Sequence, residues 1–176
     1  MNDALIISAL SLVPKHAVAG WMGAVARLRL PAPVLRQAIR FYVWKYGVNL
    51  EECAGAIEEF PSLVDFFTRE LRPGVRPVDP APEAIVSPCD GKVYSLGVVE
   101  NDRIPQSERQ VFSASELLAG STAYEGGSYA VIYLSPRDYH RVHVPRACAV
   151  QRFQYVPGEL WPVFPAATRQ IPALFS

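Results

Sequence analysis

Residues 133–145 read YLSPRDYHRVHVP and set two histidines, His140 and His143, into the mouth of a short β-rich segment. Tyr129–Leu134 is strongly apolar and Arg141–Val144 has the composition of a strand, so both are predicted strands. Histidine is the side chain whose ordinary pKa lies nearest neutrality, so a local pair is a natural place to move protons. The stretch therefore predicts a β-rich core that carries acid–base chemistry.

A second segment, Ser87-Pro-Cys-Asp-Gly-Lys92, supplies an acid, Asp90, on a tight turn. It lies between expected strands at residues 85–86 and 93–99. Asp-Gly is first of all a turn signal, because Gly91 permits positive φ and an aspartate can bond its own backbone. A structural role for Asp90 is the simpler interpretation on that evidence. The functional interpretation is that Asp90 orients one of the two histidines.

The spacing of the histidines bears on metal binding. On a helix, His140 and His143 would share a face and could bind one ion, whereas in a strand an odd offset sends them to opposite faces. Val142, Val144 and Pro145 favour a strand. We therefore expect no metal site, and a His/Asp metal hydrolase is the weakest of the functions considered.

The first fifty residues read as helices interrupted by prolines, with helices expected over 3–13, 16–29 and 33–46. They carry six Lys or Arg against one acid, a net charge of +5, whereas the whole chain has a formal net charge of zero. Because residues 1–50 (the N-terminal front) are basic and apolar and the rest of the chain is acidic, we expect this front to contact an anionic surface. The zero total argues against a general nucleic-acid binder.

The third of these helices has the pattern of a segment that lies on a membrane. Spacings near three and four residues place its bases on one side, at Arg36, Arg40 and Lys45. Aromatic side chains that favour a membrane interface lie along the front, at Trp21, Tyr42, Trp44 and Tyr46. The alternative is a helix packed on its own domain with a solvated basic edge.

Capping residues and prolines divide the chain into three predicted parts. We expect a short helix over residues 50–59, and a second one that a capping box at Ser62–Asp65 opens and that runs to Leu71. Prolines then cluster over residues 72–84. The predicted organisation is a helical membrane-associating region over 1–71, an extended connector over 72–84 and a β-rich core over 85–176.

Within the core, Ser113-Ala-Ser-Glu116 is a better capping box, for a short helix that Gly120 would end. Residues 149–156 are a further predicted strand. The fold class is therefore α+β, with N-terminal amphipathic helices before a mostly antiparallel core. Because the sequence ends on the apolar run Ala173–Ser176 without a cap, we expect this core to be truncated.

The cysteines and the apolar segments limit the setting of the protein. Cys53, Cys89 and Cys148 show no metal-ligand spacing, so we expect three buried free thiols in a reducing compartment. The start of the chain lacks the design of a signal peptide. Pro, Gly, Lys and His interrupt residues 4–26, the most apolar segment, so a spanning helix is not expected.

Four blocks, in this order, resemble the phosphatidylserine decarboxylases of the prokaryotic type. They are FFTRELRPGVRP at 66–77, SPCDGK at 87–92, YLSPRDYHRVH at 133–143 and YVPGEL at 155–160. The similarity covers the whole chain but only about the first 60% of a family member. The third block is the most specific of the four.

The resemblance implies a mechanism based on an Asp-His-Ser triad, the logic of activated serine nucleophiles. Asp90 would orient His143, and His143 would take a proton from a serine that attacks its own preceding carbonyl. The resulting ester would undergo elimination. This would leave a chain that begins with a pyruvoyl group, which is covalently bound pyruvate made from that serine. This ketone would capture the amine of phosphatidylserine and serve as the electron sink for loss of CO₂. His140 would assist decarboxylation or reprotonation.

The family's serine lies in a Leu-Gly-Ser-Thr motif that does not occur in this sequence. Ala119-Gly-Ser-Thr122 imitates the motif but precedes the histidine block instead of following it, so we exclude it as the cleavage site. The chain is thus interpreted as the N-terminal part of a zymogen, inactive alone, whose partner is a C-terminal pyruvoyl-bearing chain.

The resemblance and the composition together imply a lyase of phospholipid biosynthesis, peripheral on the cytoplasmic side of the cell membrane. Its substrate would be phosphatidylserine and its product phosphatidylethanolamine. A non-catalytic module that binds anionic lipid through residues 1–50 is the alternative. The sequence leaves open whether the front dips into lipid or packs in a homodimer.

Overall fold

The computed structural model describes residues 15–107, 110–118, 120 and 123–155, and the chain divides into two compact units. The helical unit comprises residues 23–92 and 132–151, and the strand unit comprises 1–22, 93–131 and 152–176. The expected helix over 3–13 lies outside the described residues. Helix α2, Lys15–Ala26, confirms the second expected helix and ends three residues earlier than predicted.

The helical unit is organised around α3, Ala32–Tyr46. Pro31 and Pro33 lie at its start, where a missing backbone N–H costs no helical hydrogen bond. At its end Gly47 adopts the left-handed conformation and donates its N–H to the Val43 carbonyl, a glycine C-cap. The third predicted helix is therefore confirmed.

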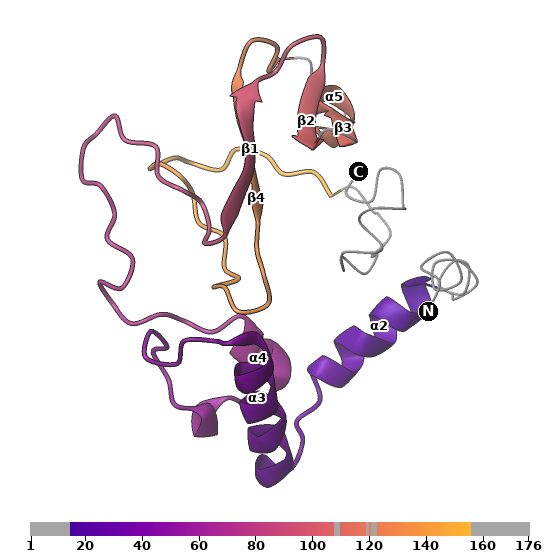
Figure 1. The fold of residues 1–176 in the computed structure, drawn as a ribbon, viewed down its shortest axis with the longest axis vertical. Helices are drawn as coiled ribbons and strands as arrows, with labels where there is room; N and C mark the ends of the chain where they lie inside the picture. The colour runs from indigo at the N-terminus through magenta and orange to yellow at the C-terminus, as the bar shows by residue number, and fades with distance from the viewer. Residues whose placement is uncertain (1–14, 108–109, 119, 121–122, 156–176) are drawn as a thin grey trace. The chain divides into compact units, whose positions relative to one another are not determined.

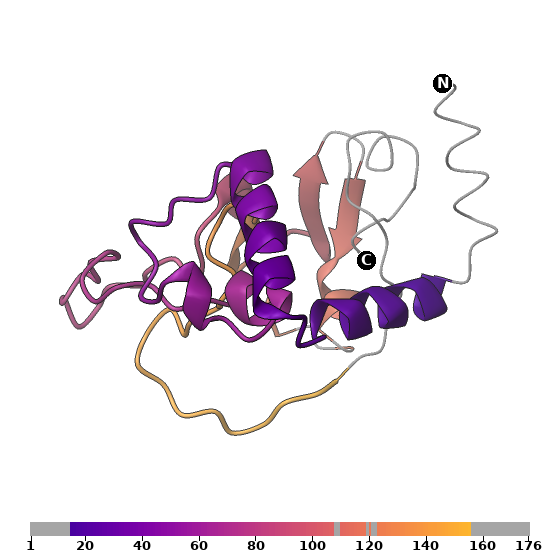
Figure 2. The same cartoon turned by 90° about the horizontal axis from the view of Figure 1, so that it is seen from below.

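The core of this unit forms where α3 meets the 3-10 turn η1, Ile57–Glu59, and helix α4, Leu63–Phe67. Figures 1 and 2 both show α4 lying against α3. The buried side chains are Leu35, Ile39, Val48 and Phe66. Removal of this apolar surface from water is the main stabilising term of the unit.

Two predicted helices are shorter than expected, for one reason. Cys53 forms an antiparallel β-bridge with Leu71. On either side of it, Ala54 donates its N–H to the Glu70 carbonyl and Arg72 donates its N–H to Glu52. Helical backbone cannot make these bonds, so the prediction for 50–59 is wrong except at η1, and α4 ends at Phe67 instead of Leu71.

The caps of the short helices are confirmed. Ser62 accepts the Asp65 N–H at the start of α4. Ser113 accepts the Glu116 N–H at the start of α5, Ala114–Leu117. Gly120 follows with a φ of +89° and donates its N–H to the Ser115 carbonyl, which ends the turn as predicted.

The strands form two two-stranded sheets (Figure 1), and all their residues except Lys92, Ile132 and Tyr133 belong to the strand unit. β1, Lys92–Val98, pairs with β4, Ser128–Tyr133. Because Val99 after β1 exchanges hydrogen bonds with Gly126 and Gly127 before β4, the two strands run in opposite directions. β2, Arg103–Ser107, and β3, Gln110–Ser113, are antiparallel, with a bulge between Pro105 and Ser107.

The α+β class and the strands β1 and β4 are confirmed, whereas β2 and β3 were not predicted. The strands expected at 85–86, 141–144 and over the described part of 149–156 are wrong, because these residues are irregular. Pro88 and Pro145 lie where the first two would pair, and proline has no N–H to donate to a ladder. Only isolated hydrogen bonds form there.

Two further expectations concern chemistry and membranes. All three cysteines are free, as predicted, but only Cys53 is buried and Cys148 is exposed, so uniform burial of the thiols is wrong. Among the described helices, none has the length and apolar character needed to cross a membrane.

Candidate functional site

Two segments about fifty residues apart in sequence lie together in the helical unit. Val86 donates its N–H to the Pro145 carbonyl at 3.0 Å, and His143 donates its N–H to the Pro88 carbonyl at 2.7 Å. The segment 86–90 therefore faces the segment 139–145. This arrangement places Asp90 and His143 on facing stretches of chain.

Gly91 lets the Asp90 turn approach β4 closely. Its φ is +132°, a conformation that side chains with a Cβ rarely adopt. A Cβ at this position would lie 2.5 Å from the Tyr133 carbonyl oxygen and 3.0 Å from a methyl carbon of Ile132. The Asp-Gly pair is thus more than a turn signal, because only glycine fits against this backbone.

The Asp90 carboxylate is held by a two-pronged bond from Arg76. Arg76 Nε donates to Oδ1 at 2.9 Å and Nη2 donates to Oδ2 at 2.7 Å, and Nη2 also reaches Glu52 at 2.7 Å. The Arg76 bonds, helped by a backbone hydrogen bond from Tyr139 and opposed by burial, hold the pKa of Asp90 below its ordinary value. The two carboxylates raise the pKa of Arg76 in turn. Asp90 is therefore an ionised carboxylate at neutral pH.

The ring of His143 is bonded to Tyr139. The Tyr139 hydroxyl lies 2.9 Å from His143 Nε2, and the two rings stack with centroids 5.5 Å apart and planes 19° apart. Tyr139 is 9% exposed. Tyr139 therefore touches both members of the predicted pair, Asp90 through its backbone and His143 through its side chain.

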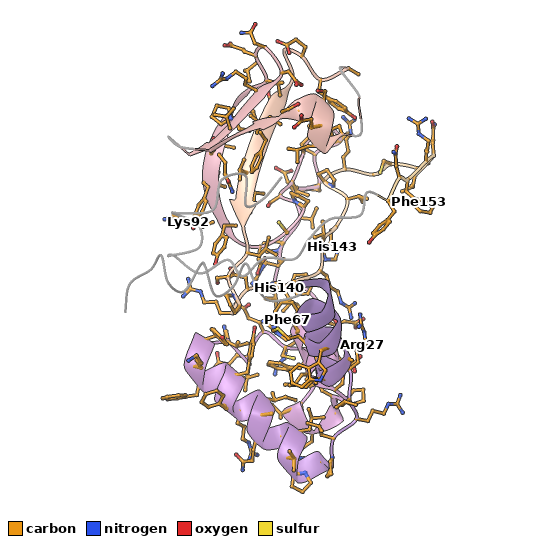
Figure 3. The ribbon with its side chains drawn as sticks, turned by 90° about the vertical axis from the view of Figure 1, so that its right-hand side faces the viewer. Arg27, Phe67, Lys92, His140, His143 and Phe153 are labelled. Carbon is orange, nitrogen blue, oxygen red and sulfur yellow. The ribbon has the colours of Figure 1, made fainter. Side chains whose placement is uncertain are left out.

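His140 is held separately. Its Nδ1 lies 2.8 Å from the Asp138 carbonyl oxygen. A carbonyl only accepts, so Nδ1 carries the hydrogen and Nε2 of the neutral ring keeps its lone pair. Phe67 from α4 packs on the ring with centroids 3.9 Å apart, and Figure 3 shows the two labelled side chains next to each other.

Helices α3 and α4 anchor the loop that carries both histidines. The Tyr42 hydroxyl donates to the Pro136 carbonyl at 2.7 Å, and burial raises the pKa of Tyr42 to about 12. The buried guanidinium of Arg69 donates to the Arg137 carbonyl at 3.0 Å. Arg141 donates to the Thr68 carbonyl at 2.7 Å. The loop is thus fixed by two side chains from the helical part, Tyr42 and Arg69, and by its own Arg141.

The structure brings together Asp90 and His143 on facing segments, with Tyr139 bonded to both, and places His140 against Phe67. Sequence reasoning missed Arg76 and Tyr139, although both lie inside the blocks that carry the family resemblance. Neither differs in type or spacing from neighbouring arginines and tyrosines, so only their contacts distinguish them. Over the residues that the structure describes, no group of three His, Cys, Asp or Glu side chains gathers to hold a metal ion.

Comparisons with known proteins point to one family. The family model for phosphatidylserine decarboxylase matches residues 63–176. A phosphatidylserine decarboxylase proenzyme of Anaeromyxobacter sp. (strain K) is 43% identical over all of this chain and 63% of its own length. Proenzymes of the same name from Myxococcus xanthus (strain DK1622) and Marinobacter nauticus are 40% and 38% identical, over 99% and 100% of this chain.

The chain spans less than two thirds of these relatives, namely 63%, 64% and 63% of their respective lengths. The matched region contains Asp90, His140 and His143, together with Arg76 and Tyr139. Identity near 40% along the whole chain is far above what a shared fold alone requires. The chain therefore belongs to the phosphatidylserine decarboxylase family.

Proposed function

We propose that this chain is the N-terminal part of a phosphatidylserine decarboxylase precursor. In the completed protein it would support self-cleavage and then the conversion of phosphatidylserine to phosphatidylethanolamine and CO₂. The observation that carries the proposal is the facing arrangement of Asp90 and His143, fixed through Tyr139, in a chain of this family. The partner is a C-terminal chain that bears the pyruvoyl group.

In this proposal His143 is the base for self-cleavage. Its backbone is tied to Pro88 and its ring is held by Tyr139, so one ring nitrogen is presented in a fixed plane. Asp90 stays ionised because of Arg76 and stabilises the positive charge that His143 gains when it takes the proton of a serine hydroxyl. Cys89 is not the nucleophile, because burial and the nearby Asp90 raise the pKa of its thiol.

His140 is assigned to the decarboxylation step. A pyruvoyl group, when present, supplies a ketone that takes up the substrate amine and accepts the electrons released with CO₂. The residues in this chain fit such a group, since His140 has Nδ1 fixed by Asp138 and Nε2 available for a proton. His140 would hold that proton and deliver it to the carbon that loses CO₂.

A lipid substrate fits the outer face of α3. Val34, Phe41 and Trp44 are exposed along one stripe, and Trp44 is 78% exposed. Phe41 and Trp44 contact each other, and the Lys45 ammonium lies 6.0 Å from the Phe41 ring. Aromatic side chains next to a base suit an anionic lipid–water interface. We therefore assign residues 1–71 to a membrane-associating region and the protein to the cytoplasmic side of the cell membrane, peripherally bound.

The test is to express this chain with and without the segment that completes the Anaeromyxobacter relative. Intact mass reports self-cleavage, and release of CO₂ from phosphatidylserine reports turnover. Cleavage and CO₂ in the completed protein alone support the proposal. A completed protein that folds, binds anionic vesicles and stays uncleaved would instead support a lipid-binding module without catalysis.

A further inference from the structure

We propose that Tyr139 is a positioning residue that sets both members of the Asp90–His143 pair. The inference rests on the proposed function and goes beyond it, because the proposed mechanism needs only the acid, the base and the serine. It assigns a task to a side chain that neither reacts nor binds substrate. The task is to fix the separation of the pair and the orientation of the His143 ring.

The burial of Tyr139 is the first support. The residue is 9% exposed, and a buried phenol needs a hydrogen-bond partner because an unsatisfied polar group in the interior is costly. The partner it has is His143 Nε2, at 2.9 Å. The near-parallel stacking of the rings leaves the imidazole little freedom to rotate away.

The backbone of the same residue gives the second support. A hydrogen bond from the Tyr139 backbone is among the contacts that lower the pKa of Asp90. Asp90 is therefore fixed on one side by Arg76 and on the other by the residue that holds the His143 ring. Since the backbone of Tyr139 bonds to Asp90 and its buried ring stacks on His143, the separation of acid and base depends on the placement of this residue.

The chemistry of the phenol matches the task. Tyrosine can donate or accept, so its hydroxyl can donate to Nε2 of the neutral imidazole and accept from Nε2–H of the imidazolium. The bond to Tyr139 can thus persist through both protonation states of His143. In the neutral ring the phenol donates to Nε2 or accepts from Nε2–H, according to the tautomer, and the same contact holds the ring in either case.

The rival interpretation is that Tyr139 only fills space, in which case phenylalanine would serve equally well. The completed precursor is therefore compared with its Tyr139→Phe and Tyr129→Phe variants. Tyr129 is the matched control, a half-buried tyrosine of the strand unit whose hydroxyl lies 3.1 Å from the Ser95 hydroxyl and 3.3 Å from the Pro105 carbonyl oxygen. Each variant loses one phenolic hydroxyl and keeps its ring.

Two measurements are made on each protein. The first is the rate of self-cleavage by intact mass. The second is the ¹⁵N chemical shift of the His143 ring nitrogens, assigned with a His143→Gln variant, which reports where the ring hydrogen lies. We expect Tyr139→Phe to slow cleavage about 3- to 10-fold, the effect of one lost hydrogen bond, and to shift the Nε2 resonance. Tyr129→Phe should change neither.

Unchanged cleavage and an unchanged Nε2 resonance in Tyr139→Phe would overturn the inference. If the parent precursor does not cleave, the proposed function fails, and the ¹⁵N spectrum alone still decides whether Tyr139 sets the His143 ring. If Tyr139→Phe does not fold, 3-fluorotyrosine at position 139 keeps the shape and makes the phenol more acidic. A shifted Nε2 resonance then supports the inference, and an unshifted one overturns it.

Discussion

At the scale of single residues, Gly91 is the position least able to accept a side chain. Both Gly91 and Gly74 have positive φ, but a Cβ at Gly74 meets no atom within 4 Å, whereas one at Gly91 meets the Tyr133 backbone at 2.5 Å. Gly74→Ala should cost about 1–2 kcal/mol from conformation alone. Gly91→Ala should cost about 3 kcal/mol or more, because a strained backbone and a clash act together. Urea unfolding of both variants measures the difference.

Gly74→Ala is the reference for a positive φ without a clash, since its φ is +82° and that of Gly91 is +132°. Equal losses of unfolding free energy in both variants would contradict the close approach of the Asp90 turn to β4. A larger loss in Gly91→Ala should be accompanied by slower self-cleavage of the completed precursor, because Asp90 is the adjacent residue.

The Arg76–Asp90 pair predicts a pH dependence of stability. Arg76 lowers the pKa of Asp90 in the folded protein below its ordinary value of 3.8, so the unfolded chain binds a proton at higher pH than the folded one. The stabilisation is therefore complete above about pH 4 and is lost as the pH falls through the lower, folded-state pKa. Asp90→Asn should flatten the decline of unfolding free energy between pH 5 and pH 3. Urea titrations across this range give the measurement. The control is Asp79→Asn, which removes an exposed carboxylate that accepts the Ala81 N–H. An equally steep decline in Asp90→Asn would refute the role of the pair.

What the sequence revealed about the site depended on chemical rarity. His140 and His143 stood out because the chain has only three histidines, and Asp90 stood out because of the adjacent glycine. Arg76 and Tyr139 could not be distinguished from 17 basic residues and eight tyrosines. Their importance comes from long-range contacts, and a sequence read alone does not contain those distances.

At the scale of elements, α3 turns two different faces to its surroundings. Leu35 and Ile39 are buried in the core, and the opposite stripe leaves Phe41 and Trp44 exposed. Trp44→Ala should weaken binding to vesicles that contain anionic lipid about 10-fold or more, since burial of a large apolar side chain is worth roughly 1.5–3 kcal/mol. Co-sedimentation with anionic and neutral vesicles tests this.

Tyr124→Ala, which removes an exposed aromatic ring from the strand unit, is the control for the vesicle experiment. It should bind like the parent protein. Equal binding by Trp44→Ala and the parent would show that the α3 stripe does not meet lipid. The exposed apolar stripe of α3 would then have to contact a partner other than lipid.

Elements with strong local signals were predicted well, and those set by distant pairing were not. The proline start and glycine end of α3 and the serine caps of α4 and α5 depend on neighbouring residues, which explains their success. The expected helix over residues 50–59 failed because the Cys53–Leu71 bridge required extended backbone. The predicted strand over residues 141–144 does not form because Pro88 and Pro145 lie on the facing segments and have no N–H to donate to a strand pairing.

At the scale of the whole molecule, the completed precursor should separate cleavage from turnover. Asp90→Asn and His143→Ala should each slow self-cleavage at least about 100-fold, the usual contribution of a positioned acid–base group, so that uncleaved precursor accumulates. His140→Ala should cleave far more readily than it decarboxylates. Gel analysis of processing and CO₂ release report the two steps.

Normal processing of either Asp90→Asn or His143→Ala would remove that residue from the cleavage mechanism. Equal losses of cleavage and turnover in His140→Ala would contradict the division of labour between the histidines.

The α+β class could be predicted because the period of the sequence changes after the helical front, whereas the sheet pairings could not. The strands β2 and β3 lack a strong alternation of apolar and polar residues. Their pairing also includes a bulge between Pro105 and Ser107, which no local sequence pattern predicts.

The hydrogen bonds from segment 86–90 to segment 139–145 also set an order of events during synthesis. A ribosome that has released the chain as far as Asp90 has made Asp90 and Arg76, but not His143. The helical core of residues 30–66 can already pack at that stage, since chains generally fold from the N-terminus as they emerge. His143 can bond to Pro88 only after residue 143 has itself been made. The proposed acid–base pair therefore assembles later in translation than the first helices.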